Sequence, residues 1–169
     1  MTLSTARMTS NSTYEHLLKL GHEPEAPLQE RESYSTRERG VVYRLEHIDR
    51  ECASFGIDGK IITEGYRCDK LLLIRCAQDK AGDKWAQVFI ELKGSDIEHA
   101  LKQLEASVSN PIFAHKTNIR RVGRIVTRGS IPGNKSNPKV AKAIEKLSKE
   151  YRCSVKILKS KQPDSFAHL

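Results

Sequence analysis

A strand pattern with two embedded charges, at residues 85–96, constrains the fold more than any other stretch of the chain. Successive side chains of a strand alternate between its two faces, so Glu91 and Lys93 share one face. The apolar residues that alternate with them, such as Ile90 and Leu92, share the other face. Burying a carboxylate and an ammonium in so apolar a strand is costly unless they are paired or bind a ligand. The stretch therefore predicts either a salt-bridged pair on a half-exposed strand or a binding site in a sheet.

The segments around this strand predict an α/β fold. Residues 67–76 have the pattern of a central strand, joined to residues 85–92 by a hairpin loop over 78–84. Residues 95–108 carry apolar side chains at helical spacing, and residues 119–128 return to a strand pattern. A strand, a helix and a strand in this order make a right-handed crossover between parallel strands.

The C-terminal third predicts a second helix and a last strand. Asn137 and Pro138 have the pattern of a helix N-cap followed by proline at the first helical position. Apolar residues at helical spacing continue to Tyr151, and residues 153–157 then alternate as in a strand.

The first sixty residues give weaker signals. Residues 12–21 predict a short helix with a Ser/Thr cap and a glycine stop. Residues 22–39 are charged and contain two prolines, which predicts a linker or a mobile arm. Residues 41–52 fit both helical spacing and strand alternation, and we favour a strand followed by a turn at 47–49. Residues 56–62, bracketed by glycines, predict a further strand.

Length and composition indicate one core. With 169 residues, 38% of them hydrophobic, we expect a peripheral arm with a short helix over 1–36, a single α/β domain over 37–160 and a polar tail over 161–169. The four cysteines form no Cys-x-x-Cys pair, which is typical of free thiols in a reducing compartment. No run reaches the roughly 18 apolar residues of a membrane helix, and no secretory signal is visible. We therefore expect a cytoplasmic protein with no membrane partner.

The charge of the chain is segregated. Residues 1–110 contain 15 Lys and Arg against 18 Asp and Glu, whereas residues 111–169 contain 14 against 3. A basic C-terminal third on an otherwise balanced chain favours a polyanionic partner, and we expect nucleic acid. A solvated basic surface is the alternative interpretation. The candidate phosphate-contacting track consists of Arg120, Arg121, Arg124, Arg128, Lys135 and Lys139.

Asp69 extends the charged pair of residues 85–96 into a candidate metal site. It lies at the beginning of the 67–76 strand, and the hairpin places the beginning of that strand beside the end of the next. Asp69 should therefore lie next to Glu91 and Lys93. Two carboxylates and a backbone carbonyl, such as that of Leu92, can hold Mg²⁺ or Mn²⁺, which makes a bound water more acidic. Lys93 would orient or help to activate the attacking water.

These residues resemble a known family. Asp69, then Glu91-x-Lys93 on the next strand, followed by a helix, a basic strand, a helix and a strand, resembles the PD-(D/E)XK nuclease superfamily over residues 57–158. The resemblance implies a restriction-endonuclease-like α/β fold, a mixed central sheet flanked by helices in an αβββαβαβ-like order. It also implies that Asp69 and Glu91 are metal ligands, that Lys93 is the catalytic lysine, and that Gln103 matches a glutamine near the site of many members.

The resemblance is incomplete in two places. Cys68 stands where the motif often has proline. Many members carry a further acidic residue upstream of the sheet motifs, and several residues of this chain are candidates for it. These candidates are Glu15, Glu32, Glu46, Glu51 and Asp58.

Three functional hypotheses remain open from the sequence. The first is a small Mg²⁺-dependent nuclease, with DNA as the expected substrate; a homodimer is usual for nucleases that cut both strands. The second is a catalytically inert module on the same fold that binds nucleic acid or protein, such as an inhibitor or a regulator. The third is an RNA-binding α+β module without a metal.

Overall fold

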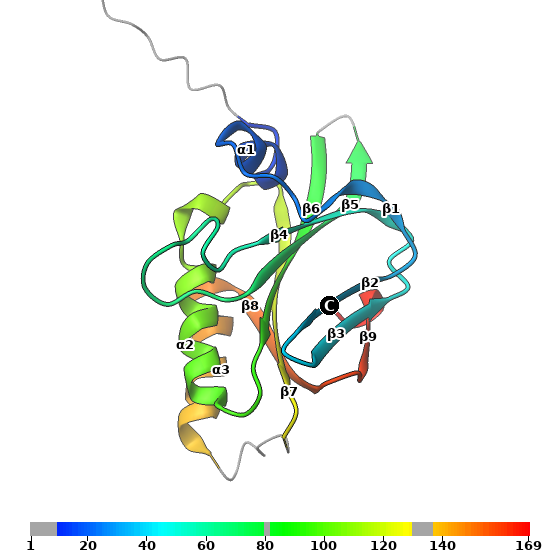
Figure 1. Cartoon of the computed structure of the whole chain (residues 1–169). Helices are drawn as coiled ribbons and strands as arrows, with labels where there is room; N and C mark the ends of the chain where they lie inside the picture. The colour runs from blue at the N-terminus through cyan, green and yellow to red at the C-terminus, as the bar shows by residue number, and fades with distance from the viewer. Residues whose placement is uncertain (1–9, 80–81, 130–136) are drawn as a thin grey trace, which may run out of the picture.

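The computed structural model describes residues 10–79, 82–129 and 137–169, which form three layers (Figure 1). The middle layer is a six-stranded sheet, in the order β1 (Ala26–Arg31), β4 (Arg50–Gly56), β5 (Lys70–Asp79), β6 (Gly82–Leu92), β7 (Asn118–Thr127) and β8 (Cys153–Lys159). One face is covered by the helices α2 (Ile97–Val108) and α3 (Pro138–Tyr151). The other is covered by a three-stranded sheet, in the order β2 (Tyr34–Glu38), β3 (Val41–Glu46) and β9 (Pro163–Ser165). The remaining elements are α1 (Thr13–Lys19) and two 3₁₀ turns, η1 (Pro111–Phe113) and η2 (Phe166–His168).

The connectivity of the central sheet confirms the predicted mixed α/β class. β4, β5 and β6 form an antiparallel meander, whereas β6, β7 and β8 are parallel to one another. The connections from β6 to β7 and from β7 to β8 pass through α2 and α3, as the strand–helix–strand pattern predicts. One feature was not expected: a second sheet, rather than helices, covers the other face of the central sheet.

Burial on both faces explains the apolar run of β6. Its residues 85–92 are all buried. Val88 and Ile90 pack in one cluster with Tyr43 of the small sheet, whereas Phe89 packs in the other cluster with Leu104 of α2. Glu91 and Lys93 alternate with Ile90 and therefore lie on the helix side of the sheet.

Two predictions for the first sixty residues are wrong. The predicted linker over residues 22–39 contains β1 and β2, and the predicted strand over residues 56–62 is a turn. β1 is an edge strand with mostly polar side chains, so it lacks the apolar alternation that identifies a strand. The turn passes through Gly59, whose φ of 73° glycine adopts without strain. The strand and turn favoured for residues 41–52 are confirmed as β3, a connection and the beginning of β4.

The C-terminal segment, predicted to be a polar tail over residues 161–169, is packed into the fold. β9 pairs in parallel with β3, and Asp164 is only 3% exposed. The Asp164 carboxylate accepts a hydrogen bond from Arg124 Nε at 2.7 Å and another from the Tyr43 hydroxyl at 2.8 Å. One buried ion pair thus joins the tail, the central sheet and the small sheet.

Close packing of α2 against the sheet positions the candidate site. α2 approaches β7 at Gly123, where a Cβ atom would lie 2.5 Å from a methyl carbon of Leu104. Ser107 of α2 accepts a hydrogen bond from the Cys68 backbone amide at 2.9 Å through its buried hydroxyl. The helix therefore fixes the residue that immediately precedes Asp69.

The cysteines form no disulfide bond, as their spacing in the sequence predicts. All four cysteines are free, and Cys52, Cys68 and Cys153 are buried. Burial raises the pKa of the Cys153 thiol to about 12, so this group is a poor nucleophile. Within the described residues, no helix combines the length and the apolarity that crossing a membrane requires.

Candidate metal centre

The pairing of β5 with β6 brings Asp69 to Glu91, as the sequence predicts. Lys70 is the register partner of Ile90, and the Asp69 amide donates to the Ile90 carbonyl at 3.1 Å. The Asp69 side chain then turns back toward β6, where its Oδ2 accepts a hydrogen bond from the Leu92 amide at 2.7 Å. The Asp69 carboxyl group is therefore fixed beside Glu91 by the backbone of the neighbouring strand.

A cavity of about 240 Å³ lies at this end of the strands. All the residues predicted to be catalytic or to hold metal line it, together with Asp58 and Arg128. The predicted residues are Asp69, Glu91, Leu92, Lys93 and Gln103. The cavity also receives Glu38, Arg39 and Val41 from the tip of the β2–β3 hairpin.

Two oxygen atoms in the cavity lining are buried without a hydrogen-bond partner. They are Oε2 of Glu91, a residue that is 2% exposed, and Oε1 of Gln103 on α2. Buried polar atoms are normally satisfied, so each unpaired one needs an explanation. A metal ion coordinated by these oxygen atoms, or a ligand that donates hydrogen bonds to them, would supply the missing partner for both atoms.

The environment raises the pKa of both central carboxyl groups. Burial is the largest cause for Glu91, and the neighbouring Asp69 adds to it, so the pKa of Glu91 rises to about 9 although Lys93 opposes the change. Burial likewise raises the pKa of Asp69 to about 6, against the hydrogen bond from the Leu92 amide. The charges of Glu38 and Asp58 raise the pKa of Asp69 further. A cation in the cavity would reverse these effects, because it stabilises the ionised carboxylates.

These pKa values predict that the metal-free protein loses stability as pH rises. The pKa values of Asp69 and Glu91, about 6 and about 9, exceed the ordinary values of 3.8 and 4.5. The native state therefore binds more protons than the unfolded state in this range, and the associated stability, complete below about pH 4, is lost as pH rises through both values. Thermal unfolding in EDTA should show Tm falling between about pH 5 and pH 9. An Asp69→Asn/Glu91→Gln double variant should flatten the profile, and an equal slope in both proteins would contradict the pKa values.

The structure discriminates among the acids predicted as the upstream ligand. Asp58 lines the cavity and forms an ion pair with Arg67. Glu15 instead pairs with Lys19 at 2.8 Å. The other candidates also lie elsewhere: Glu32 is exposed between β1 and β2, Glu46 ends β3 beside Ser165, and Glu51 pairs with Arg75.

Sequence reasoning missed Glu38 and Arg39. Both lie in residues 22–39, whose composition predicts a linker or a mobile arm, yet they line the cavity from the hairpin tip. The sequence signal for this hairpin is the Arg39-Gly40 pair, which precedes the alternating apolar residues Val41, Tyr43 and Leu45. Both residues of that pair have positive φ, 50° and 79°, as a two-residue hairpin turn requires.

The structure does not support a continuous track of basic side chains along β7. Arg124 is buried at 1% exposure and paired with Asp164, so its predicted place on an exposed phosphate-contacting face is wrong. The small sheet and the C-terminal segment cover the middle of β7, which the strand's own sequence does not reveal. Arg120 and Arg128 are exposed, but eight residues of strand separate them by about 26 Å.

The other predicted nucleic-acid contacts are dispersed. Arg128 lines the cavity, whereas Arg121 is half-buried and its Nε donates to Gln87 at 3.2 Å. Lys139 is exposed at the beginning of α3. Lys135 lies outside the described residues.

The cavity offers two neighbouring carboxyl groups, those of Asp69 and Glu91, as possible ligands for a cation. Among residues 10–79, 82–129 and 137–169, no group of three or more His, Cys, Asp or Glu side chains is arranged to hold a metal ion. Mg²⁺ keeps several waters and is commonly held by one or two carboxylates. Asp69 and Glu91, with the unpaired Oε2 of Glu91, fit that requirement.

Comparison of the chain with family models, with curated proteins and with solved structures found no match. The class that the described residues define is a mixed α/β protein with a carboxylate-lined cavity at the ends of two antiparallel strands.

Proposed function

We propose that the protein is a metal-dependent nuclease of the PD-(D/E)XK type, which hydrolyses phosphodiester bonds in DNA. One observation carries the proposal: Asp69, Glu91, Lys93 and Gln103 line one cavity, and two of their buried oxygen atoms have no partner. The order of elements supports the fold assignment, because the meander β4–β5–β6 is followed by α2, β7, α3 and β8.

Asp69 and Glu91 would hold Mg²⁺ or Mn²⁺, with the Leu92 carbonyl as a further donor. When bound, the metal would lower the pKa of a water and offset the charge of the phosphate. The protein contributes rigidity, since the Leu92 amide fixes one oxygen of Asp69 at 2.7 Å beside Glu91. Little reorganisation of the carboxylates is then needed during the reaction.

The cationic residues of the cavity would act on the phosphate and on the attacking water. Lys93 follows Glu91 on the same face of the strand, so its ammonium group can orient the water and offset the negative charge that develops on phosphorus. Arg128, which follows β7, and Arg39 of the hairpin tip line the same cavity. Gln103 would donate through its amide nitrogen to a phosphate oxygen or to a water while its Oε1 accepts a hydrogen bond.

The proposal is tested by incubating plasmid, linear duplex, single-stranded DNA and RNA with the protein in Mg²⁺, Mn²⁺ or EDTA. We expect DNA cleavage with either metal and none in EDTA. Lys93→Ala should lower the cleavage rate by at least about 100-fold while leaving DNA affinity within about twofold, because a general acid–base group contributes on this scale. Lys102→Ala, at an exposed position of α2, is the matched control.

The alternative function is distinguished by the same experiment. If DNA binds equally well in EDTA and no metal supports cleavage, the protein is a binding module on this fold. A homodimer that cuts both strands also stays a prediction, and sedimentation of the protein with and without DNA would test it.

A further inference from the structure

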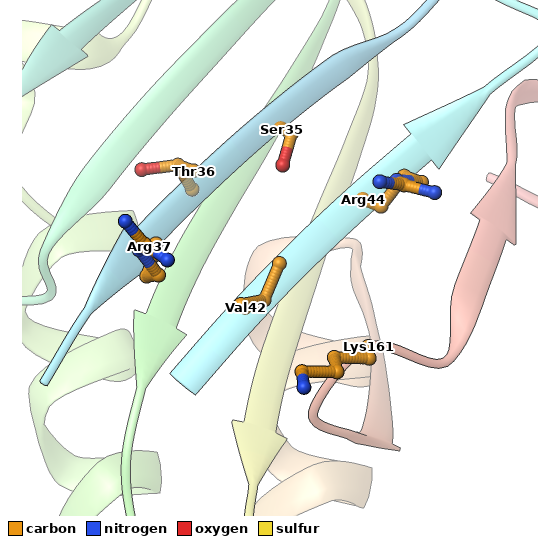
Figure 2. Close-up of a pocket in the computed structure, with 6 residues that line it drawn as sticks. All are labelled: Ser35, Thr36, Arg37, Val42, Arg44 and Lys161. Atoms are coloured by element: carbon orange, nitrogen blue, oxygen red, sulfur yellow. The ribbon is translucent and has the colours of Figure 1, made fainter. Parts of the chain in front are cut away.

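The outward face of the small sheet carries a hollow of about 520 Å³ (Figure 2). Its lining comes from β2, from β3 and from the segment that leads into β9, which is far away in sequence. The lining residues are Ser35, Thr36, Arg37, Val42, Arg44 and Lys161. Three of these six side chains are cationic and none is acidic.

Strand register places the three cationic residues close together on this face. Arg37 is the register partner of Val42, and the Lys161 amide donates to the Val42 carbonyl at 3.0 Å from the other side. Arg37, Val42 and Lys161 therefore form one row across the sheet. Arg44 follows two residues after Val42, on the same face, with Ser35 as its register partner.

Alternation in β3 separates this face from the core. Val41, Tyr43 and Leu45 point toward the central sheet and are at most 1% exposed. Arg44 therefore points away from the core and is exposed, as Arg37 and Lys161 are. Figure 2 shows the three side chains around the same hollow, where they come from β2, from β3 and from the turn before β9.

The three cations are free for an external anion. Throughout the part of the chain that the structure describes, no carboxylate forms an ion pair with Arg37, Arg44 or Lys161 at 4.0 Å or less. This contrasts with Arg75 and Arg124, each of which has a carboxylate partner. The hydroxyl group of Ser35, the register partner of Arg44, adds a hydrogen-bond donor that phosphate oxygens accept.

We propose that this face binds the phosphate backbone of nucleic acid. Arg37 and Lys161 lie on opposite sides of Val42, two strand spacings or about 10 Å apart, and Arg44 lies about 7 Å farther along β3 than Val42. This spread suits several phosphates of a polymer better than one small anion. The lining contains no aromatic ring for base stacking, so backbone contact without sequence preference is expected.

The position of the hairpin connects this face with the candidate metal centre. Arg37 lies on the outward face, and the next two residues, Glu38 and Arg39, line the 240 Å³ cavity. A nucleic-acid strand held on the outward face thus reaches the cavity by passing over the hairpin tip. The inference rests on the proposed function for the identity of the ligand, but it does not require cleavage.

The test measures affinity for a short duplex DNA of mixed sequence, in EDTA, as a function of salt. A triple variant with Arg37→Ala, Arg44→Ala and Lys161→Ala should bind at least about tenfold more weakly, and the slope of log K against log salt should fall by about 3. The matched control removes the same charge from exposed positions of α3, with Lys142→Ala, Lys146→Ala and Lys149→Ala. This control should stay within about twofold of the wild type.

Each outcome of this comparison is decisive. Unchanged binding by the first variant, or an equal loss in both variants, would overturn the inference, since the second result would reflect net charge alone. A specific loss of binding in a protein that never cleaves would retain the inference and remove the proposed nuclease. DNA cleavage by the wild type, together with unchanged affinity in the first variant, would retain the proposed nuclease and remove the inference. Thermal unfolding confirms that both variants remain folded.

Discussion

Glu91→Gln is expected to abolish DNA cleavage, with a rate loss of at least about 100-fold, while Tm at neutral pH stays the same or rises. The substitution keeps the shape of a side chain that is 2% exposed and removes the charge needed to hold a metal. Stability should not suffer, because burial and Asp69 already disfavour the ionised form of Glu91, whose pKa is raised to about 9. Cleavage rate, Mn²⁺ binding by calorimetry and thermal unfolding in EDTA measure the three consequences.

An exposed carboxylate on α2 provides the control for this experiment. Glu98→Gln makes the same chemical change outside the cavity lining, and its cleavage rate should match that of the wild type. Cleavage by Glu91→Gln at the wild-type rate would remove Glu91 from the proposed metal site. A loss of activity together with a large fall in Tm would indicate a structural role instead.

Arg124→Ala is expected to cost about 3–5 kcal/mol of unfolding free energy, because it leaves a buried carboxylate without its partner. The Asp164 side chain is fully buried, and Tyr43 would be its remaining side-chain hydrogen-bond donor. For a chain of this length the loss corresponds to a fall in Tm of roughly 10 °C. Urea denaturation and thermal unfolding measure it.

Two further variants identify the cause of that loss. Arg120→Ala removes an exposed arginine from the same strand and should change the unfolding free energy by no more than about 0.5 kcal/mol. Arg124→Met combined with Asp164→Leu should recover much of the stability, since apolar pairs often replace buried ion pairs without loss. Equal stability of Arg124→Ala and Arg120→Ala would mean that the buried pair contributes nothing.

The central part of the candidate site was predictable because its determinants are local. Strand alternation places Glu91 and Lys93 on one face, and a hairpin brings Asp69 to them. The helical spacing of α2 likewise brings Gln103 to the cavity. These features depend on segments that adjoin in the sequence, and a single chain displays their patterns directly.

The features that could not be predicted depend on distant segments. Arg124 has the sequence context of a basic strand face, and only Asp164, 40 residues later, determines that it is buried. The small sheet is similarly hidden, because Tyr34 is the only apolar residue of β2 and because β9 has three residues. Within the small sheet, only β3 shows alternating apolar residues. The pairing of β3 with its neighbouring strands depends on packing that no local sequence pattern encodes.

The parallel pairing of β9 with β3 also determines the order in which the strands of the small sheet can pair during synthesis. The hairpin that carries Glu38 and Arg39 leaves the ribosome early, whereas β3 gains its second neighbour only after residues 163–165 have emerged. Tyr43 and Asp164, which are hydrogen-bonded across the two sheets, are 121 residues apart in the chain. A nascent chain can therefore complete the β2–β3 hairpin, whose tip lines the cavity, well before β3 pairs with β9.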